Sequence, residues 1–222
     1  MIVTIDGPAG AGKSTVARAL ANRLGFRFLD TGAMYRAVAL AALQRGLPWD
    51  DPDQIVELAR NLQLDVTETS VAIDGQDVTQ AIRTSEITSL THYAANNPGV
   101  REHLVDLQRA AAGDDNIVTE GRDQGTVVFP QAECKIYLTA TPEERARRRA
   151  DELARRGETV SVRDVLAKQN QRDARDASRS VGPLVAADDA TEVATDGLSP
   201  TEVIDRLESL VRERMHALSQ MG

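Results

Sequence analysis

The residues with the clearest chemical signature lie near the N-terminus, where residues 7–14 read Gly-Pro-Ala-Gly-Ala-Gly-Lys-Ser. This matches the G-x-x-x-x-G-K-[ST] pattern of a phosphate-binding loop. Its glycines let backbone N–H groups turn toward phosphate oxygens, and a following helix points its positive dipole end at them. Lys13 is placed for the β- and γ-phosphates, and the Ser14 hydroxyl for Mg²⁺. We expect nucleoside triphosphate contacts from Gly7, Pro8, Ala9, Gly10, Ala11, Gly12, Lys13, Ser14 and Thr15, with Ser14 as the metal ligand.

A second polar group follows a predicted strand and opens a helix, in the segment Leu-Asp-Thr-Gly-Ala-Met-Tyr-Arg at residues 29–36. In a parallel sheet such a junction lies at the carboxyl edge, where ligands bind. Thr31 and Tyr35 offer hydroxyls, and Arg36 offers a fork of donors suited to phosphate. An ordinary helix cap with a solvated arginine is the alternative interpretation.

Two more groups resemble the second in chemistry. Residues 119–126 follow a strand, and there Arg122 could bind a phosphate while Asp123 could approach a hydroxyl or a metal; a polar turn is the alternative. On a predicted helix, Arg172, Asp176 and Arg179 are spaced i, i+4, i+7 and share one face. A face held together by its own salt bridges would explain the same spacing.

Charge is unevenly distributed over the 222 residues, whose net charge is −8. Between residues 145 and 179, ten arginines and one lysine stand against six acidic residues. A basic segment on an acidic protein indicates where an anion binds. Together with the phosphate loop, it points to a kinase acting on a small phosphorylated acceptor, because bringing two anions together requires many cations.

The elements that must position these groups alternate between short apolar runs and amphipathic helices, which predicts a parallel α/β sheet. An Asp-Gly pair at residues 74–75 indicates an antiparallel hairpin, and hence an inserted subdomain over residues 38–98. We expect strands at 2–6, 26–29, 116–119, 135–138 and 191–194, and helices at 13–24, 32–45, 53–62, 84–94, 97–112, 142–156, 161–177 and 200–217.

Composition restricts the class of protein. A pI near 5.0 does not favour binding to nucleic acid or to a membrane surface. No apolar stretch approaches the roughly 18 residues of a membrane span. The phosphate loop follows the N-terminus so closely that we expect no cleaved signal peptide. The lone Cys134 cannot form an internal disulfide and fits a reducing cytoplasm.

At this point the motifs resemble those of bacterial cytidylate kinases, the (d)CMP kinases of the nucleoside monophosphate kinase superfamily. The match runs nearly end to end and is most specific at residues 5–14, 29–36, 120–130 and 172–184. The resemblance implies a three-layer α/β P-loop kinase with a five-stranded parallel sheet, an inserted acceptor-binding subdomain and a short lid at residues 145–160. It also implies ATP and CMP or dCMP as substrates, Mg²⁺ as cofactor, and a monomer.

Carried over position by position, the resemblance assigns acceptor binding to Thr31, Tyr35, Arg36, Arg109, Arg122, Asp123, Arg172, Asp176 and Arg179. It places Arg172 and Asp176 near the sugar, Arg36, Arg122 and Arg179 near the phosphate, and Arg109 near the cytosine. Catalytic roles are expected for Lys13, Arg122, Asp123 and Arg148, with further lid candidates at Arg145, Arg149, Arg155 and Arg156. His92 falls where relatives often have a base-reading serine, and a surface or packing histidine is the alternative interpretation.

Three alternatives remain open at this stage. Another nucleoside monophosphate could be the acceptor, because the preference for cytosine depends on the resemblance. A GTPase switch is disfavoured, since none of the three lysines follows an asparagine as in an Asn-Lys-x-Asp guanine-binding motif. A non-catalytic nucleotide-binding module is disfavoured because Lys13, Ser14 and the arginine groups are all present.

Overall fold

The computed structural model describes residues 1–155 and 157–220, in two compact units. The first, called the sheet unit, comprises Met1–Phe28 and Asp115–Gly222, and the second, the helical unit, comprises Leu29–Asp114. Among the described residues, no helix is long and apolar enough to cross a membrane.

A five-stranded sheet organises the sheet unit, with the strand order β2-β6-β1-β7-β8. Its strands are β1 (Ile2–Asp6), β2 (Arg27–Asp30), β6 (Ile117–Gly121), β7 (Cys134–Thr139) and β8 (Thr191–Ala194). β1 runs parallel to both β6 and β7, with Ile5 opposite Glu120 on one side and Ile136 on the other. The predicted α/β class and parallel sheet are therefore confirmed.

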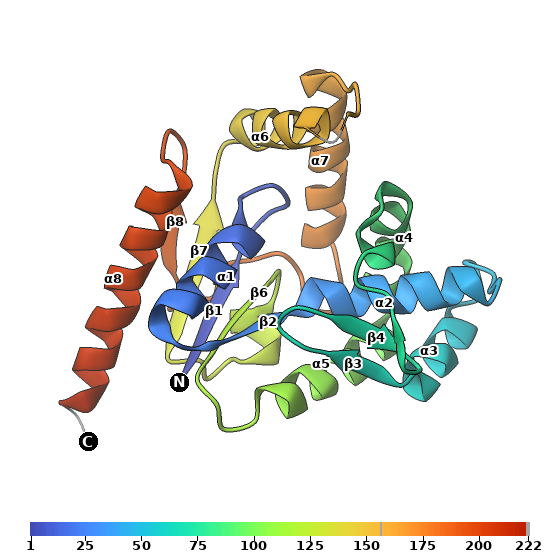
Figure 1. The fold of residues 1–222 in the computed structure, drawn as a ribbon, viewed down its shortest axis with the longest axis horizontal. Helices are drawn as coiled ribbons and strands as arrows, with labels where there is room; N and C mark the ends of the chain where they lie inside the picture. The colour runs from blue at the N-terminus through green and yellow to red at the C-terminus, as the bar shows by residue number, and fades with distance from the viewer. Residues whose placement is uncertain (156, 221–222) are drawn as a thin grey trace. The chain divides into compact units, whose positions relative to one another are not determined.

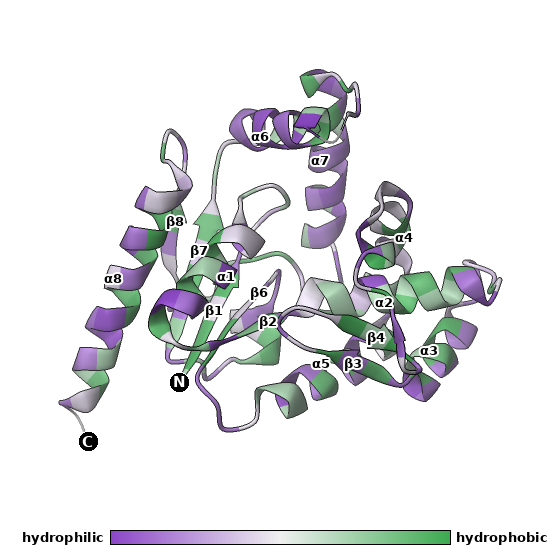
Figure 2. Ribbon diagram, in the orientation of Figure 1, coloured by the Kyte–Doolittle hydropathy of each residue, from purple (hydrophilic) through white to green (hydrophobic). Residues whose placement is uncertain are grey.

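Helices of the sheet unit divide into two groups. α1 (Lys13–Leu24) and α8 (Pro200–Ser219) pack on the strands (Figure 1) and share one apolar core, in which Val16, Leu20, Val203 and Leu207 are buried. α6 (Pro142–Arg155) and α7 (Val162–Ala177) pack on each other through a smaller cluster around Leu153 and are largely hydrophilic (Figure 2). The helices α6 and α7 therefore bury little apolar surface, and polar contacts contribute more to holding them against the rest of the sheet unit.

Three helices of this unit begin at side-chain caps. Ser199 and Glu202 form a reciprocal capping box at the start of α8. Thr141 Oγ1 accepts the N–H of Glu144 at the start of α6, and Ser161 caps α7. One expectation was wrong: Arg179 does not lie on the helix with Arg172 and Asp176, because α7 ends at Ala177.

The helical unit holds α2 (Thr31–Gln44), α3 (Pro52–Asn61), the 3₁₀ turn η1 (Ala81–Arg83), α4 (Ser85–Ala95) and α5 (Pro98–Ala112). A small antiparallel sheet joins them, made of β3 (Leu64–Val66), β4 (Val71–Ile73) and β5 (Gln76–Asp77). Asp74 and Gly75 both have positive φ angles between β4 and β5, so the predicted hairpin turn is confirmed.

The segment after β6 is more structured than the polar turn that was its alternative interpretation. Residues Gln124–Val128 form a π-helical turn, η2, and the Gln124 side chain is fully buried. Gln124 Oε1 accepts the hydroxyl of Thr119 at 2.9 Å, which fixes the turn against the end of the strand. Candidate site residues in this segment are therefore next to a packed turn rather than on an irregular surface loop.

Candidate active site

The phosphate loop, residues 7–14, connects β1 to α1 and has the geometry that the motif requires. Gly7 has a φ of 146°, and a Cβ there would lie 2.0 Å from the carbonyl oxygen of Leu138 on β7. Gly12 has a φ of 87° at the cap of α1. Within the described chain, no hydrogen bond engages the N–H groups of Gly10, Ala11 and Gly12, so these donors are available to an anion.

Lys13 begins α1 with its side chain buried and its Nζ donating to the carbonyl of Pro8 at 2.8 Å. Burial, together with the positive charges of Arg122 and Arg172, lowers the pKa of Lys13 to about 7, against the opposing effect of Glu120. Three cationic groups are thus held close together, and a bound polyphosphate would relieve their mutual repulsion.

A carboxylate pair lies next to the loop. Ser14 Oγ donates to Oε1 of Glu120 at 2.7 Å, and Asp6 accepts the N–H groups of Gln124 and Gly125 at 2.9 and 2.7 Å. Burial raises the pKa of Asp6 to about 6. Asp6 was not predicted as a site residue, although its place at the end of β1, directly before the loop, was an available signal.

Arg122 and Arg179 are brought together by one buried carboxylate. Arg122 Nε donates to Oδ2 of Asp176 at 2.9 Å, and Arg179 pairs with Oδ1 of the same side chain. Burial alone would raise the pKa of Asp176, but the charges of Arg122, Arg179 and Arg172 outweigh it and lower that pKa. Part of the predicted acceptor set is therefore assembled in the sheet unit, and this includes Arg179 from beyond the helix.

Three of the predicted acceptor residues of the helical unit, Thr31, Tyr35 and Arg36, lie in the first two turns of α2. Asp30 caps this helix by accepting the N–H of Ala33 at 2.9 Å, and it also accepts Nη2 of Arg36 and of Arg83, each at 3.2 Å. Thr31 and Tyr35 are buried beside it. Arg36 Nε is buried without a hydrogen-bond partner in the described part of the chain, which leaves one donor for a ligand. Sequence reasoning missed Asp30 and Arg83.

The remaining expected residues make other contacts, and one of them lies outside the described residues. Arg109 lies on α5, 4.0 Å from Asp106. His92 Nδ1 lies 2.6 Å from the carbonyl of Ser89, and its ring is 4.1 Å from that of Tyr93. Asp123 is buried at the start of η2. Arg156 lies outside the described residues.

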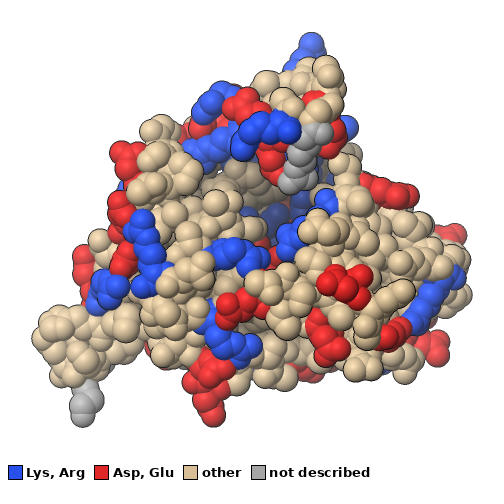
Figure 3. All heavy atoms as spheres, viewed as in Figure 1, with Lys and Arg blue, Asp and Glu red and all other residues tan. Residues whose placement is uncertain are grey.

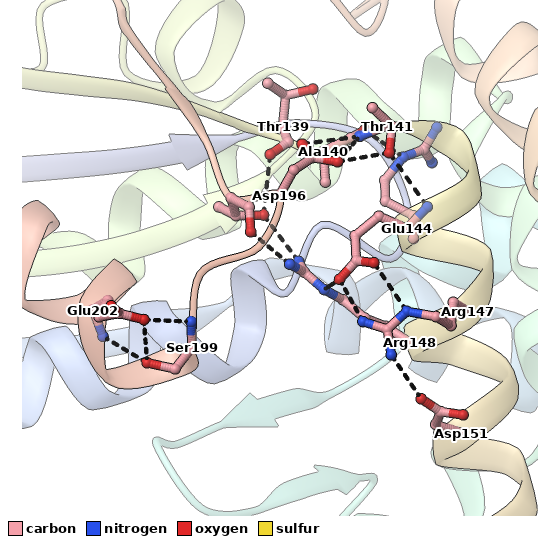
Figure 4. A network of polar contacts seen from close by, with 12 residues as sticks. Thr139, Ala140, Thr141, Glu144, Arg147, Arg148, Asp151, Asp196, Ser199 and Glu202 are labelled. Carbon is pink, nitrogen blue, oxygen red and sulfur yellow. Dashed lines mark hydrogen bonds and ion pairs between the residues drawn. The ribbon is translucent and has the colours of Figure 1, made fainter.

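Arginines of the predicted lid are engaged in polar networks. Arg148 donates from Nε to Glu144 at 2.8 Å and binds the hydroxyl and the carbonyl of Thr195 at 2.9 and 2.6 Å. Figure 4 shows this network beside Asp196, which accepts both the N–H and the hydroxyl of Thr141. Basic and acidic side chains alternate over α6 at the top of Figure 3. Arg148 thus holds the loop after β8 in this structure.

A strand, a glycine-rich loop and a helix that begins with lysine and serine, on a parallel sheet of this order, define a P-loop phosphotransferase fold. A family model described as cytidylate kinase matches residues 3–213. The chain belongs to the cytidylate kinase family. The predicted family, the enzyme class and the cytidylate kinase activity that the family implies are thereby confirmed.

Individual proteins similar to this chain agree with the family match. The chain is 54% identical over 217 residues to a cytidylate kinase of Rhodopirellula baltica, covering 98% of this chain and 95% of that protein. It is 46% identical over 221 residues to a cytidylate kinase of Geobacter sulfurreducens, with 98% and 95% covered. Among solved structures, an uncharacterized protein of Eubacterium ventriosum is similar in fold alone, with a TM-score of 0.52, 11% identity, and coverage of 96% of this chain and 98% of that one.

Proposed function

We propose that this chain transfers the γ-phosphoryl group of ATP to CMP or dCMP, giving ADP and CDP or dCDP for pyrimidine nucleotide metabolism. The observation that carries the proposal is the buried Lys13 at the start of α1, close to Arg122 and Arg172, in a chain of the cytidylate kinase family. An oxygen of the acceptor phosphate attacks the γ-phosphorus in line, and the bond to the β-phosphate oxygen breaks as ADP leaves. No covalent enzyme intermediate is needed.

On the donor side, the phosphate loop would bind the triphosphate. Its unengaged N–H groups and the dipole of α1 favour anionic oxygens. Lys13 would add a positive charge for the β- and γ-phosphates, because its Nζ already lies within the loop against Pro8. The proposed ATP contacts are those predicted above, from Gly7 to Thr15.

Mg²⁺ fits the oxygen donors at this position. Ser14 Oγ and Oε1 of Glu120 lie 2.7 Å apart, and hard oxygen ligands of this kind suit magnesium. Within the described residues there is no cluster of three or more metal-ligating side chains. That agrees with a metal held by Ser14 and by substrate phosphates. When bound, the ion would neutralise charge developing on the phosphate oxygens.

On the acceptor side, Arg36, Arg122 and Arg179 would bind the phosphate of CMP, and Arg172 and Asp176 its sugar. Asp176 holds Arg122 and Arg179 in place, so their guanidinium groups need little reorganisation when the phosphate binds. The full proposed acceptor set is Thr31, Tyr35, Arg36, Arg109, Arg122, Asp123, Arg172, Asp176 and Arg179.

Charge in the transition state would be spread by Lys13, Arg122 and Arg148, with Asp123 approaching the acceptor. Residues 38–98 would form the acceptor-binding insert and residues 145–160 the lid, both moving on binding to exclude water from the γ-phosphate. Hydrogen exchange with and without both nucleotides tests this. Unchanged protection of both segments would contradict closure.

We further propose a cytoplasmic monomer that binds only small-molecule substrates. Cys134 supports this location, since it is a buried free thiol and its burial raises the pKa to about 11, which suppresses the reactive thiolate. Sedimentation of the purified protein tests the monomer. A concentration-dependent dimer would contradict it.

The acceptor is identified by a coupled assay of ADP release with CMP, dCMP, UMP, AMP and GMP at matched concentrations. Turnover with CMP and dCMP well above that with the purine nucleotides supports the proposal. Preference for UMP or AMP would reassign the chain to another nucleoside monophosphate.

Replacement of Lys13 in the proposed ATP-binding loop is the second test of the proposed function. Lys13→Met keeps a side chain of similar length in the buried position but removes the charge, so turnover should fall by at least about 10³-fold while the melting temperature stays close to that of the wild type. Arg147→Ala, which removes an exposed arginine of α6, is the matched control and should retain full activity. Near wild-type turnover by Lys13→Met would refute the assignment of the loop.

A further inference from the structure

The phosphate loop is held at Ala9 by two side chains from the helices α6 and α7. The N–H of Ala9 donates to Oδ1 of Asp173 at 3.1 Å, and the carbonyl of Ala9 accepts Nη1 of Arg145 at 2.7 Å. These bonds engage the peptide groups on both sides of Ala9, so the backbone direction there is fixed by residues more than a hundred positions away in the sequence.

Asp173 and Arg145 are also bound to each other. Arg145 Nη1 lies 2.6 Å from Oδ2 of Asp173, and its Nε donates to the carbonyl of Ala140 at 3.1 Å. The Arg145 side chain is 5% exposed and that of Asp173 is 17% exposed. Removing charges from water costs several kcal/mol per ion, so a buried pair of this kind is weak evidence for a purely stabilising role.

Gly10, the next residue of the phosphate loop, lies close to side chains of the same two helices, α6 and α7. A Cβ on Gly10 would lie 2.5 Å from Nε2 of Gln169 on α7 and 3.3 Å from the Cβ of Arg145. Gln169 Nε2 in turn donates to the carbonyl of Arg145 at 3.4 Å. The tip of the loop thus rests against α6 and α7, and the position of both helices is linked directly to it.

We propose that Asp173 and Arg145 are positioning residues for phosphoryl transfer, which fix Ala9 so that the N–H groups of Gly10 to Gly12 are directed at the phosphates of ATP. The inference depends on the proposed assignment of residues 7–14 as the ATP loop. Because Asp173 already occupies the N–H of Ala9, the loop donors for phosphate begin at Gly10. Donors held in place before binding need no reorganisation during the reaction.

Arg145 therefore acts on the donor through the loop backbone. It was expected among the lid arginines that approach the transferring group, but its Nε and Nη1 groups donate to Ala140, Ala9 and Asp173. Asp173 also lies between Arg172 and Asp176 on α7, so one helix carries both the support of the donor loop and two proposed acceptor residues.

The test compares Asp173→Ala, Asp173→Asn and Arg145→Lys with the control Arg147→Ala, whose exposed ion pairs lie on α6 away from the loop. Displacing the loop should lower kcat/KM for ATP by roughly 10- to 100-fold and weaken ADP binding, measured by calorimetry, to a similar degree. KM for CMP should change by less than about twofold. Asp173→Asn retains an oxygen that can accept the N–H of Ala9, so it should lose less than Asp173→Ala.

Asp173→Asn keeps the size of the side chain and therefore guards against simple misfolding. If both Asp173 variants keep kcat/KM for ATP within twofold of the wild type, the inference is wrong. It is equally wrong if KM rises equally for both substrates in step with a loss of melting temperature, since that indicates structural damage alone. If Lys13→Met loses activity while both Asp173 variants keep wild-type activity, this inference is wrong and the proposed function stands. If Lys13→Met is itself active, the proposed function is wrong.

Discussion

The hydroxyl of Ser14 donates to the carboxylate of Glu120 at 2.7 Å, which joins the first turn of α1 to the end of β6. Strand pairing explains the contact: Glu120 lies opposite Ile5 in the parallel ladder, so the end of β6 is level with the start of the phosphate loop. A hydroxyl and a carboxylate are thereby placed together beside Lys13, where the proposed function requires a magnesium ion.

This relationship predicts how the rate depends on magnesium. Ser14→Ala removes the proposed ligand, and Glu120→Gln removes the charge that orients it. Both should raise the Mg²⁺ concentration for half-maximal rate, by roughly 10-fold or more for Ser14→Ala, as is typical for loss of a group that orients a metal ligand. Initial rates over a magnesium titration at saturating substrates measure this. Glu192→Gln, an exposed carboxylate change on β8, should leave the titration unchanged. Identical curves for all variants would contradict the proposed metal position.

The arginines assigned to the acceptor phosphate give a second prediction. Arg36→Ala and Arg179→Ala each remove a charged donor, so KM for CMP should rise by roughly 10- to 100-fold while KM for ATP changes by less than about twofold. Steady-state kinetics with each substrate varied in turn provides the measurement. Arg45→Ala removes an arginine whose pair with Asp74 is exposed, and it should alter neither constant. A rise in KM for ATP instead would show that the division into donor and acceptor residues is wrong.

Local signals in the sequence predicted much of this fold because helix caps and tight turns depend on neighbouring residues. Ser199 and Glu202 lie three positions apart and form the capping box that their spacing indicates. Asp74 and Gly75 supply the two positive φ angles of a hairpin turn without help from distant residues. Residues 7–14 could be interpreted as a phosphate loop for the same reason.

Residues whose roles depend on distant partners escaped prediction. Asp6 binds N–H groups 118 and 119 positions away, and Arg83 reaches Asp30 across 53 positions. Arg179 was placed on a helical face by its spacing, but α7 ends before it and its contact with Asp176 is made from the following turn. No local pattern encodes the contacts of Asp6 and Arg83, because these form only when distant segments pack. The contact of Arg179 with Asp176 joins residues three positions apart, and only the end of the helix was misjudged.

The buried carboxyl of Asp6 predicts a pH dependence of stability. Burial raises its pKa from 3.8 to about 6, so between these values the folded chain retains a proton that the unfolded chain has lost. The contribution of Asp6 to the free energy of unfolding is therefore greatest at low pH. It is lost as pH rises through about 6, and the total loss is on the order of 3 kcal/mol. Urea unfolding from pH 4 to pH 7 measures it against Asp6→Asn, which cannot ionise.

The difference between the wild type and Asp6→Asn should thus shift in favour of the variant as pH rises. At low pH Asp6 is protonated and, like the amide of Asn, offers one carbonyl oxygen to the two N–H groups, so the wild type and the variant should differ little in stability there. Asp51→Asn is a control of opposite sign, because hydrogen bonds from Gln54 lower the pKa of the exposed Asp51. If the difference in the free energy of unfolding between the wild type and Asp6→Asn stays constant from pH 4 to pH 7, the burial argument is contradicted.

The close approach of Gly7 to β7 predicts that replacing Gly7 by alanine destabilises the fold more than replacing Gly25 does. In Gly7→Ala the new Cβ would lie 2.0 Å from the carbonyl oxygen of Leu138, and a sheet backbone cannot move aside as a flexible side chain can. The free energy of unfolding should fall by about 3 kcal/mol or more. Gly25→Ala, at the end of α1, has a φ of 69° but no atom within 4 Å of the new Cβ, so only conformational strain of about 1–2 kcal/mol is expected. Urea denaturation of both variants distinguishes steric overlap from strain, and equal losses would show that the contact with Leu138 relaxes without cost.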